Sequence, residues 1–276
     1  MKPEEPLISF VGAGPGAADL ITLRGADRLA NADVVVWASS LVPKTLLVHV
    51  SADAVVHDSA IMTLEDVLAV YERHPGASIV RLHSGDPSLY GAIGEQIEWC
   101  VAHERSFEIV PGVSSAAAAA AAVAKELTVP GIAQSVVLTR LASRTSESVP
   151  AGERIASFAS VPCTLAIFLS AARPEALQAE LLAPPSLISD QTPAAVVIRA
   201  SWPDERVIET TVGKLAADMR AAGATTTVLV LVGEALSGAG RARSHLYSPG
   251  FAHGFRRRSV PGSTTGRPAV RHGAGG

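Results

Sequence analysis

The stretch RLHSGDPSLYG at residues 81–91 does most to predict both a fold and a site. It follows the apolar run 78–82 and precedes a helical pattern, so we predict a loop at the carboxyl end of a strand, where open α/β sheets place ligand sites. Gly85 allows a sharp turn or the close approach of a ligand, and Asp86 precedes a proline that favours extended backbone. The alternative interpretation of these residues is an ordinary turn after a strand.

The loop GAGPG at residues 12–16 follows the first apolar run and forms, with Ala17, the G-x-G-x-x-A spacing of dinucleotide-binding proteins. An NAD-dependent oxidoreductase is therefore one alternative. Pro15 argues against it because proline lacks the N–H that would donate to a pyrophosphate. Asp19 adds negative charge nearby, and residues 38–40, after the second predicted strand, hold no carboxylate for a ribose hydroxyl. The same gap argues against an ordinary Rossmann-type methyltransferase.

The composition indicates a large core. The chain has 276 residues, of which 48% are hydrophobic and 18% charged, enough for one large or two medium domains. The formal charge of −3 argues against general nucleic-acid binding. Residues 251–276 hold five arginines and no acid, which leaves −8 on the remainder. This segment is rich in Gly, Ser, Pro and Arg and has no periodicity, so we predict a disordered tail.

No segment predicts secretion or membrane insertion. The N-terminus carries acids and no apolar signal core, and the small-residue run 116–124 is shorter than the ~20 residues that span a bilayer. Cys100 and Cys163 lie far apart without metal-ligand spacing, which favours free thiols in a reducing compartment. We therefore expect a cytoplasmic protein with no protein-bound metal and no nucleic-acid or membrane partner.

Apolar periodicity predicts alternating strands and helices, the pattern of an α/β sheet. Thr22 is placed to cap a helix whose apolar residues include Leu23 and Leu29, and TLED at residues 63–66 resembles a capping box. Helices are also expected at 93–101 and 214–222. Strands are expected at 7–11, 34–37, 78–82, 108–110, 135–139, 164–169, 194–198 and 225–232.

A domain boundary is predicted where Pro-Gly at 111–112 ends a strand. Ser114 and Ser115 can cap a helix through the alanines at 116–124, and alanine is the best helix former. The free N–H groups at the start of that helix would face a cleft between two lobes. The expected units are an N-terminal α/β lobe at 1–112, a C-terminal α/β lobe at 113–250 and the tail at 251–276.

The chain carries ordered motifs at residues 12–16, 19–22, 40–43, 83–91, 110–115 and 138–140. In order and spacing over residues 7–235, these motifs together resemble the tetrapyrrole methylases of the cobalamin pathway. Ser-Leu-Tyr at 88–90 and SLVP at 40–43 favour the branch that acts on precorrin-4 over the uroporphyrinogen-III methyltransferases. Ala17–Ala18, Ser84 and SRTS at 143–146 depart from the usual pattern, which affects loop geometry.

The resemblance implies two α/β lobes of the tetrapyrrole methylase type with an active-site cleft between them. It implies that S-adenosylmethionine binds in a folded form in that cleft and donates a methyl group to C11 of precorrin-4 or cobalt-precorrin-4. It also implies a homodimer. Carried over by motif, or for the last two by strand ends, the cofactor contacts would be Pro15, Ser84, Gly85, Asp86, Leu89, Ser114, Ser115, Leu169 and Ala200.

The expected chemistry asks little of acid–base side chains, because positioning alone can contribute on the order of 7–11 kcal/mol in the best intramolecular models. The sequence offers no triad in motif context. His83 and Asp86 are the candidates for a catalytic role. A tetrapyrrole carries carboxylates, which arginine binds in a fork geometry. The predicted substrate-binding residues are Arg81, Tyr90, Arg140 and Arg144.

Three alternatives to C11 methylation stay open at this stage. One is a different member of the same pathway that methylates uroporphyrinogen-III or another precorrin. A second is the NAD-dependent oxidoreductase, which the glycine spacing suggests. A third is a non-catalytic binding module that has kept the fold, although Gly85, Asp86 and Pro87 are intact.

Overall fold

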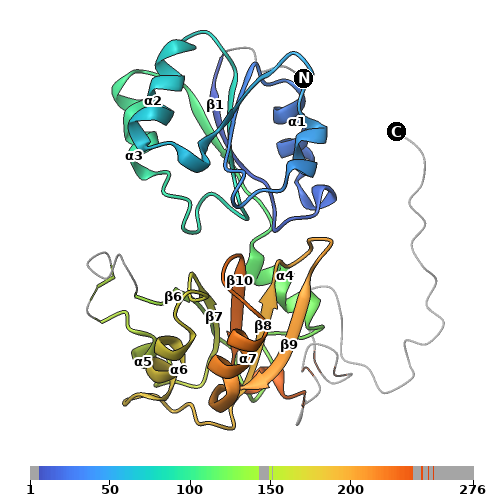
Figure 1. Cartoon of the computed structure of the whole chain (residues 1–276), viewed down its shortest axis with the longest axis vertical. Helices are drawn as coiled ribbons and strands as arrows, with labels where there is room; N and C mark the ends of the chain where they lie inside the picture. Colours follow the sequence, from blue (N-terminus) through green and yellow to red (C-terminus); the bar gives the residue numbers. More distant parts are fainter. Residues whose placement is uncertain are drawn as a thin grey trace, which may run out of the picture.

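The computed structural model describes residues 6–142, 149–150 and 152–238, together with residues 244, 248 and 251. The chain forms two lobes, one above the other in Figure 1, and each is built on a five-stranded sheet. This arrangement confirms the predicted pair of α/β lobes. Within the described ranges, no helix has the length and apolar character needed to cross a membrane.

The N-terminal lobe holds a sheet of order β3-β2-β4-β1-β5 in which every neighbouring pair is parallel. The central strands are buried on both faces, as in the sequence VVVW of β2, because helices cover both sides. α1 lies on one side of the sheet, and α2 and α3 lie on the other (Figure 1). The elements are β1 (Ile8–Gly12), α1 (Leu23–Ala30), β2 (Val34–Trp37), β3 (Val55–Asp58), α2 (Leu64–Arg73), β4 (Ile79–His83), α3 (Gly94–Ala102) and β5 (Phe107–Val110).

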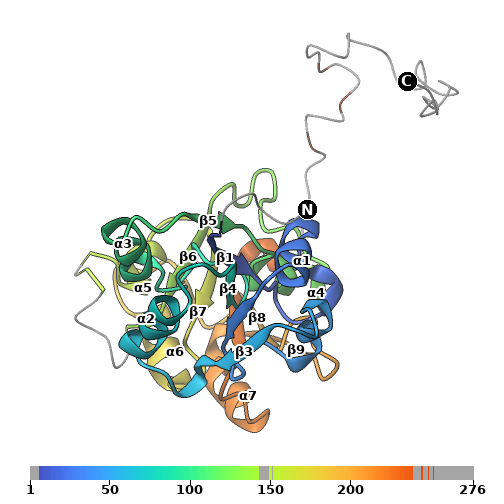
Figure 2. The same ribbon diagram turned by 90° about the horizontal axis from the view of Figure 1, so that it is seen from above.

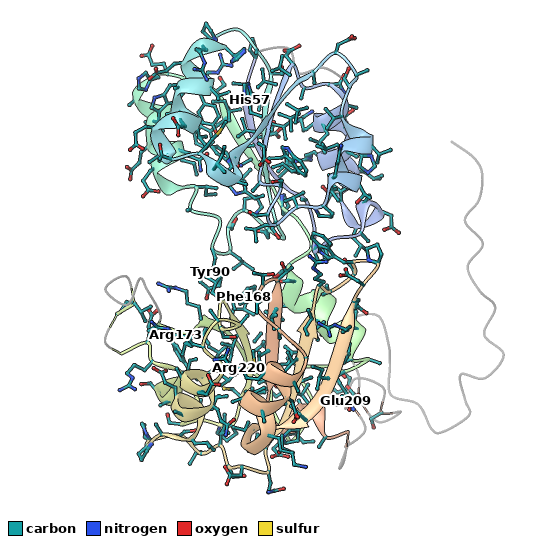
Figure 3. The ribbon with its side chains drawn as sticks, viewed as in Figure 1. His57, Tyr90, Phe168, Arg173, Glu209 and Arg220 are labelled. Carbon is teal, nitrogen blue, oxygen red and sulfur yellow. The ribbon has the colours of Figure 1, made fainter. Side chains whose placement is uncertain are left out.

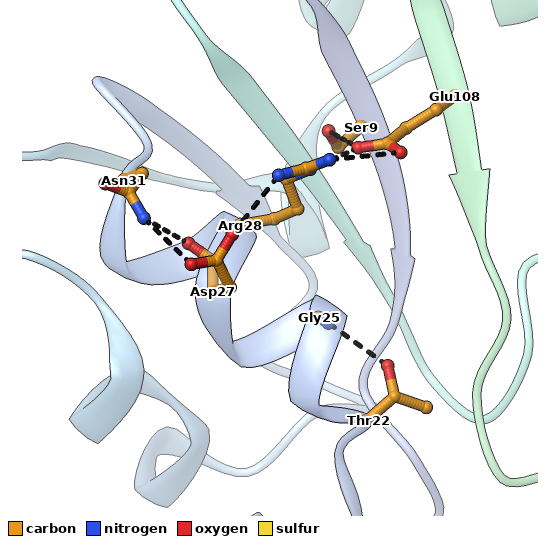
Figure 4. A network of polar contacts seen from close by, with 7 residues as sticks. All are labelled: Ser9, Thr22, Gly25, Asp27, Arg28, Asn31 and Glu108. Carbon is orange, nitrogen blue, oxygen red and sulfur yellow. Dashed lines mark hydrogen bonds and ion pairs between the residues drawn. The ribbon is translucent and has the colours of Figure 1, made fainter. Parts of the chain in front are cut away.

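Local capping residues begin two of these helices as predicted. The Thr22 side chain accepts a hydrogen bond from Gly25 N at 3.1 Å (Figure 4). Thr63 and Asp66 form the expected reciprocal capping box at the start of α2. Arg28 then fixes α1 against the sheet through an ion pair with Glu108 on the edge strand β5.

The C-terminal lobe holds a mixed sheet of order β6-β7-β10-β8-β9. Only β6 and β7 pair in parallel, while β10 runs antiparallel to both of its neighbours. α5, α6 and α7 pack on one face, and the alanine-rich α4 packs on the other. The elements are α4 (Ser115–Ala122), β6 (Val136–Arg140), α5 (Ile155–Phe158), β7 (Thr164–Phe168), α6 (Pro174–Leu182), β8 (Pro193–Ile198), β9 (Arg206–Thr211), α7 (Leu215–Ala221) and β10 (Val228–Val232).

The chain passes between the lobes only a few residues after β5. Ser114 caps α4, accepting a hydrogen bond from Ala116 N at 3.3 Å, so the helix begins at the point that the serine pair predicts. Ala116 and Ala119 face the sheet and are buried, since a methyl side chain lets the helix lie close to β10. Figure 2, seen from above, shows the two lobes superposed along this crossing.

One strand begins later than the sequence indicates. The stretch 225–232 is predicted as a single strand, but pairing starts at Val228, opposite Ile198. Threonine suits strands, which explains the prediction. Thr225, Thr226 and Thr227 instead form the loop before β10, and Thr227 has a left-handed φ of 52°.

Candidate functional site

A cavity of about 470 Å³ lies between the lobes, at the edges where the strands of both sheets end. Its volume lies within the range of small-molecule sites. Eleven of the sequence-predicted site residues line it: Pro15, Ser84, Gly85, Asp86, Leu89, Tyr90, Ser114, Ser115, Arg140, Leu169 and Ala200. They come together from positions up to 185 residues apart in the sequence.

Backbone forms the part of the N-terminal wall where the two glycine loops meet, and the side chains of Leu89 and Tyr90 lie beside it. The two glycine loops join where Gly85 N donates to Gly14 O at 2.8 Å and Gly14 N donates to Gly85 O at 3.2 Å. Both glycines have left-handed φ angles, 77° and 64°, which favour glycine. The loops after β1 and β4 therefore form one continuous surface.

Three glycines meet beneath this wall. A Cβ on Gly112 would lie 2.1 Å from Gly85 O and 2.8 Å from the Cα of Gly12. These are backbone atoms, which cannot move aside as a flexible side chain can. The crossing between the lobes thus packs directly on the ends of β1 and β4.

Asp86 holds this corner together. Its Oδ1 accepts a hydrogen bond from Ser88 N at 2.8 Å, and its Oδ2 accepts one from Gly112 N at 2.9 Å. The carboxylate therefore connects its own loop to the interlobe crossing. These contacts support a structural role at the cavity wall beside any contact with a ligand.

The C-terminal wall is built from side chains at strand ends. Phe168 ends β7 and Leu169 follows it, Ala200 lies just after β8, and Thr227 precedes β10. β10 runs opposite to β7 and β8, so its beginning lies at the same edge as their ends. Leu169 has a left-handed φ of 53° and is 62% exposed, an unusual conformation of the kind that gathers at functional sites.

Tyr90 and Phe168 meet across the gap between the lobes (Figure 3). Their ring centroids are 5.1 Å apart with an interplanar angle of 51°. Partial burial raises the pKa of the Tyr90 hydroxyl, and the positive charge of Arg140 opposes that rise. The aromatic pair and Arg140 place apolar and cationic groups side by side at the cavity.

Arg81 and His83 do not line the cavity. Both belong to β4, and the Arg81 guanidinium donates to Ser59 Oγ at 3.0 Å and to Val36 O at 3.3 Å. His83 is 7% exposed, packs near Phe10 and has no hydrogen-bond partner for its Nε2 among the described residues. Burial and the charge of Arg81 lower the pKa of His83 to about 3, so its ring is neutral at pH 7. Arg144 lies outside the described residues.

The sequence missed part of the lining. Leu41 belongs to the SLVP motif and reaches the cavity, although no role was assigned to it. The loop at 225–227 gave no signal because it resembles the start of a strand. The other lining residues not predicted are Phe168, Ala171, Ala172, Val197, Val228 and Leu229.

The first glycine loop has few N–H groups left to bind a phosphate. Ala13 N donates to His83 O at 2.7 Å, and Gly14 N donates to Gly85 O. Ala17 N donates to Ser201 Oγ at 3.0 Å, and Pro15 has no N–H. A dinucleotide site needs such donors free, so this geometry argues against the oxidoreductase alternative.

The cavity can hold a small ligand with apolar and polar parts. Backbone groups and serine hydroxyls line part of it, and aliphatic and aromatic side chains from both lobes line the rest. No nucleophile–base pair stands out among the described lining residues. A cavity with both kinds of lining can position two reactants beside each other.

Comparisons with known proteins agree with the family resemblance of the sequence motifs. Residues 7–216 match the family profile described as Tetrapyrrole (Corrin/Porphyrin) Methylases. The chain is 43% identical over 243 residues to a precorrin-4 C(11)-methyltransferase of Mycobacterium tuberculosis, covering 87% of this chain and 96% of that protein. It is 39% identical to a cobalt-precorrin-4 C(11)-methyltransferase of Methanocaldococcus jannaschii, covering 91% and 96%.

Solved structures agree with the sequence comparisons. A cobalt precorrin-4 methyltransferase superposes with a TM-score of 0.79 at 41% identity, covering 83% of this chain and 95% of that one. A uroporphyrin-III C-methyltransferase of Thermus thermophilus, complexed with S-adenosylhomocysteine, superposes with a TM-score of 0.67 at 27% identity, covering 84% and 99%. The precorrin-4 enzymes are thus more similar to this chain than that relative.

Proposed function

Because this chain belongs to the tetrapyrrole methylase family, we propose that it transfers a methyl group from S-adenosylmethionine to C11 of precorrin-4 or cobalt-precorrin-4 in cobalamin biosynthesis. The observation that carries the proposal is the similarity to C11-methyltransferases over almost their full length. The interlobe cavity supports it, because it gathers the motif residues on which the resemblance depends.

The cavity residues fit S-adenosylmethionine. When bound, this cofactor supplies an electrophilic methyl group on a sulfonium. Backbone groups of the 84–86 loop would bind its polar parts, and Leu89, Leu169 and Ala200 would contact its apolar parts. Pro15, Ser114 and Ser115 would complete the site. The joined loops hold these groups in place before the ligand arrives, which lowers the entropic cost of binding.

The substrate would lie beside the cofactor, at the mouth of the cavity. Arg140 would bind a substrate carboxylate, and the Tyr90 ring would contact the face of the macrocycle. Arg81 lies outside the cavity lining and donates to Val36 O and Ser59 Oγ, so this proposal gives it no contact with the substrate. Arg144 keeps its predicted substrate role.

Catalysis in this proposal depends on positioning. A reduced tetrapyrrole carbon is itself a nucleophile, so the protein must align it with the methyl group and exclude water. Asp86 would act mainly by fixing the loop that contacts the cofactor. His83 would support that loop through its backbone carbonyl, which accepts a hydrogen bond from Ala13 N.

The full-length protein tests the proposal. It is incubated with methyl-labelled S-adenosylmethionine and a panel holding precorrin-4, cobalt-precorrin-4, other precorrins and uroporphyrinogen-III. Mass spectrometry and NMR then locate the label. Label at C11 supports the proposal, whereas label only on uroporphyrinogen-III or at another carbon supports the other pathway members.

Thermal shifts separate the remaining classes. S-adenosylhomocysteine should raise the melting temperature and NAD should not. Stabilisation by NAD alone would support the oxidoreductase, and binding without methyl transfer to any substrate would support a non-catalytic module.

We also propose a cytoplasmic homodimer. The unbridged Cys100 and Cys163 fit a reducing compartment, and the family resemblance supports the dimer. Analytical ultracentrifugation of the purified chain tests the assembly.

A further inference from the structure

A short segment of the C-terminal lobe, Arg199–Trp202, contacts the first glycine loop of the N-terminal lobe. The Trp202 indole Nε1–H donates to Pro15 O at 3.0 Å. The Ser201 hydroxyl accepts a hydrogen bond from Ala17 N at 3.0 Å. Two hydrogen bonds thus cross between the lobes at one point, away from the covalent crossing at residues 111–114.

Gly16 lies between these two contacts, and the Trp202 indole leaves no room for a side chain at this position. A Cβ on Gly16 would lie 2.2 Å from Cδ1 and 2.4 Å from Nε1 of Trp202. Such distances require either a bare Cα at this position or a displaced ring. The Cδ1–Nε1 edge of the indole therefore lies against the backbone of the loop, and its hydrogen bond to Pro15 depends on that fit.

The segment Arg199–Trp202 contacts the N-terminal lobe in an unusual backbone conformation. Arg199 and Ser201 both have left-handed φ angles, 53° and 65°, which cost energy in residues other than glycine. Its own neighbours hold it there. Ser201 N donates to Glu205 Oε2 at 2.6 Å, and Arg199 pairs with Asp204 and lies 5.0 Å above the Trp202 ring.

The contact adjoins the cavity at both of its ends. Pro15, whose carbonyl receives the indole N–H, lines the cavity, and so does Ala200, which lies between the two strained residues. Trp202 and Ser201 do not line it. They can therefore affect a bound ligand only by setting where Pro15 and Ala200 stand.

We propose that Trp202 and Ser201 are positioning residues for the cofactor, which fix the width of the site by joining the Pro15 loop to the end of β8. This inference rests on the proposed function. It predicts that weakening the contact loosens cofactor binding, chiefly through faster dissociation, because the two walls no longer stay at a fixed separation. The affinity for the tetrapyrrole, which lies toward Tyr90, should change less.

Trp202→Phe tests the indole hydrogen bond, since it keeps an aromatic ring on Gly16 and removes the N–H. One hydrogen bond corresponds to about a two- to tenfold change in affinity. We expect the Kd for S-adenosylhomocysteine, measured by calorimetry, and the KM for S-adenosylmethionine to rise by that factor. The KM for the tetrapyrrole should stay within about twofold. The matched control is Trp99→Phe in α3, where the ring stacks on His103 far from the cavity.

Ser201→Gly separates positioning from stability. Glycine suits a φ of 65° and relieves the strain, but it removes the hydroxyl that accepts from Ala17 N. A purely structural residue would give a variant with unchanged binding and equal or higher melting temperature. We expect the melting temperature to hold or rise while the Kd for S-adenosylhomocysteine rises severalfold.

The two proposals fail in different ways. If the wild-type chain methylates a tetrapyrrole while both variants bind S-adenosylhomocysteine with wild-type affinity, the positioning role is wrong and the function stands. If the wild-type chain does not bind S-adenosylhomocysteine, both proposals are wrong. A rise in the tetrapyrrole KM equal to that for the cofactor would also overturn the positioning role.

Discussion

The two lobes meet the cavity with different kinds of wall. The parallel sheet of the N-terminal lobe brings the ends of β1 and β4 to one edge, where their loops bond to each other through Gly14 and Gly85. The mixed sheet of the C-terminal lobe presents side chains such as Phe168 and Leu169. The N-terminal wall is backbone where the two loops join, with the side chains of Leu89 and Tyr90 beside it, whereas the C-terminal wall is mainly side chain.

This difference predicts how each lobe tolerates change. A wall of backbone in mutual contact has no room for an added Cβ, because main-chain atoms cannot rotate away. A wall of side chains can adjust by changing rotamers, and exchanges of similar volume are tolerated there. Substitutions in the two lobes should therefore differ in both size and sign.

The largest expected effect comes from Gly112→Ala, which would break the N-terminal wall. Its Cβ would lie 2.1 Å from Gly85 O. Backbone displacement on this scale should lower the free energy of unfolding by at least about 3 kcal/mol. Chemical denaturation measures the change. Gly94→Ala is the control, since no described atom beyond its chain neighbours and its own helix lies within 4 Å of the added methyl group, and the helix α3 should gain about 0.5 kcal/mol. Equal stabilities of the two variants would refute the backbone wall.

Asp86→Asn tests the side chain that ties this wall together. An amide has one oxygen, so its NH₂ group must face either Ser88 N or Gly112 N, both of which donate. Loss of a charge-assisted hydrogen bond should cost about 2–3 kcal/mol in urea unfolding. Binding of S-adenosylhomocysteine should weaken as well. Asp53→Asn on an exposed loop serves as the matched control. A wild-type unfolding curve for the Asp86 variant would show that the carboxylate is dispensable.

The pH dependence of stability tests the buried part of β4. The pKa of His83 is lowered to about 3 from 6.5, mainly by burial. Below pH 6.5, His83 binds a proton in the unfolded chain but stays neutral in the folded chain. The free energy of unfolding therefore falls as the pH drops toward 3. His83 should contribute a loss of about 2 kcal/mol between pH 7 and pH 5. His83→Gln should flatten this slope, and the same change at the exposed His103 should not. An unchanged slope in the His83 variant would contradict its burial as a neutral ring.

The smallest effect, with the opposite sign, is expected on the C-terminal wall. Leu169 is exposed and has a φ of 53°, so Leu169→Gly should relieve strain and raise stability by about 1 kcal/mol. The same change removes an apolar contact from the cavity, so the Kd for S-adenosylhomocysteine should rise. Thermal unfolding and calorimetry measure both effects. A loss of stability would mean that packing of the Leu169 side chain stabilises the fold by more than its backbone strain destabilises it.

Local signals in the sequence predicted much of the fold. Thr22 and Thr63 begin helices because a threonine side chain can satisfy free N–H groups within its own turn. The motif around Gly85 predicted a loop at a strand end, because glycine permits a sharp turn and the proline after Asp86 interrupts regular structure. β3 and β9 were missed, because each is an edge strand with a mixed pattern of exposure and a weak periodic signal.

Residues on one strand show where local reasoning ends. Arg81 and His83 lie next to the motif in sequence, and their chemistry predicted a place in the site. Strand alternation turns both side chains to the same face, where Phe10 and Ser59 surround them. Proximity in sequence to Gly85 therefore did not bring them to the cavity.

The sequence by itself determined the two-lobed α/β class, the capped helices and the glycine loops, because each depends on conformational preferences of a few neighbouring residues. Only the tertiary structure decided that the loops after β1 and β4 bond to each other, that Tyr90 meets Phe168 and that Trp202 reaches Pro15. These contacts join residues far apart in the chain, and their geometry follows from the packing of two complete sheets, which no local pattern records.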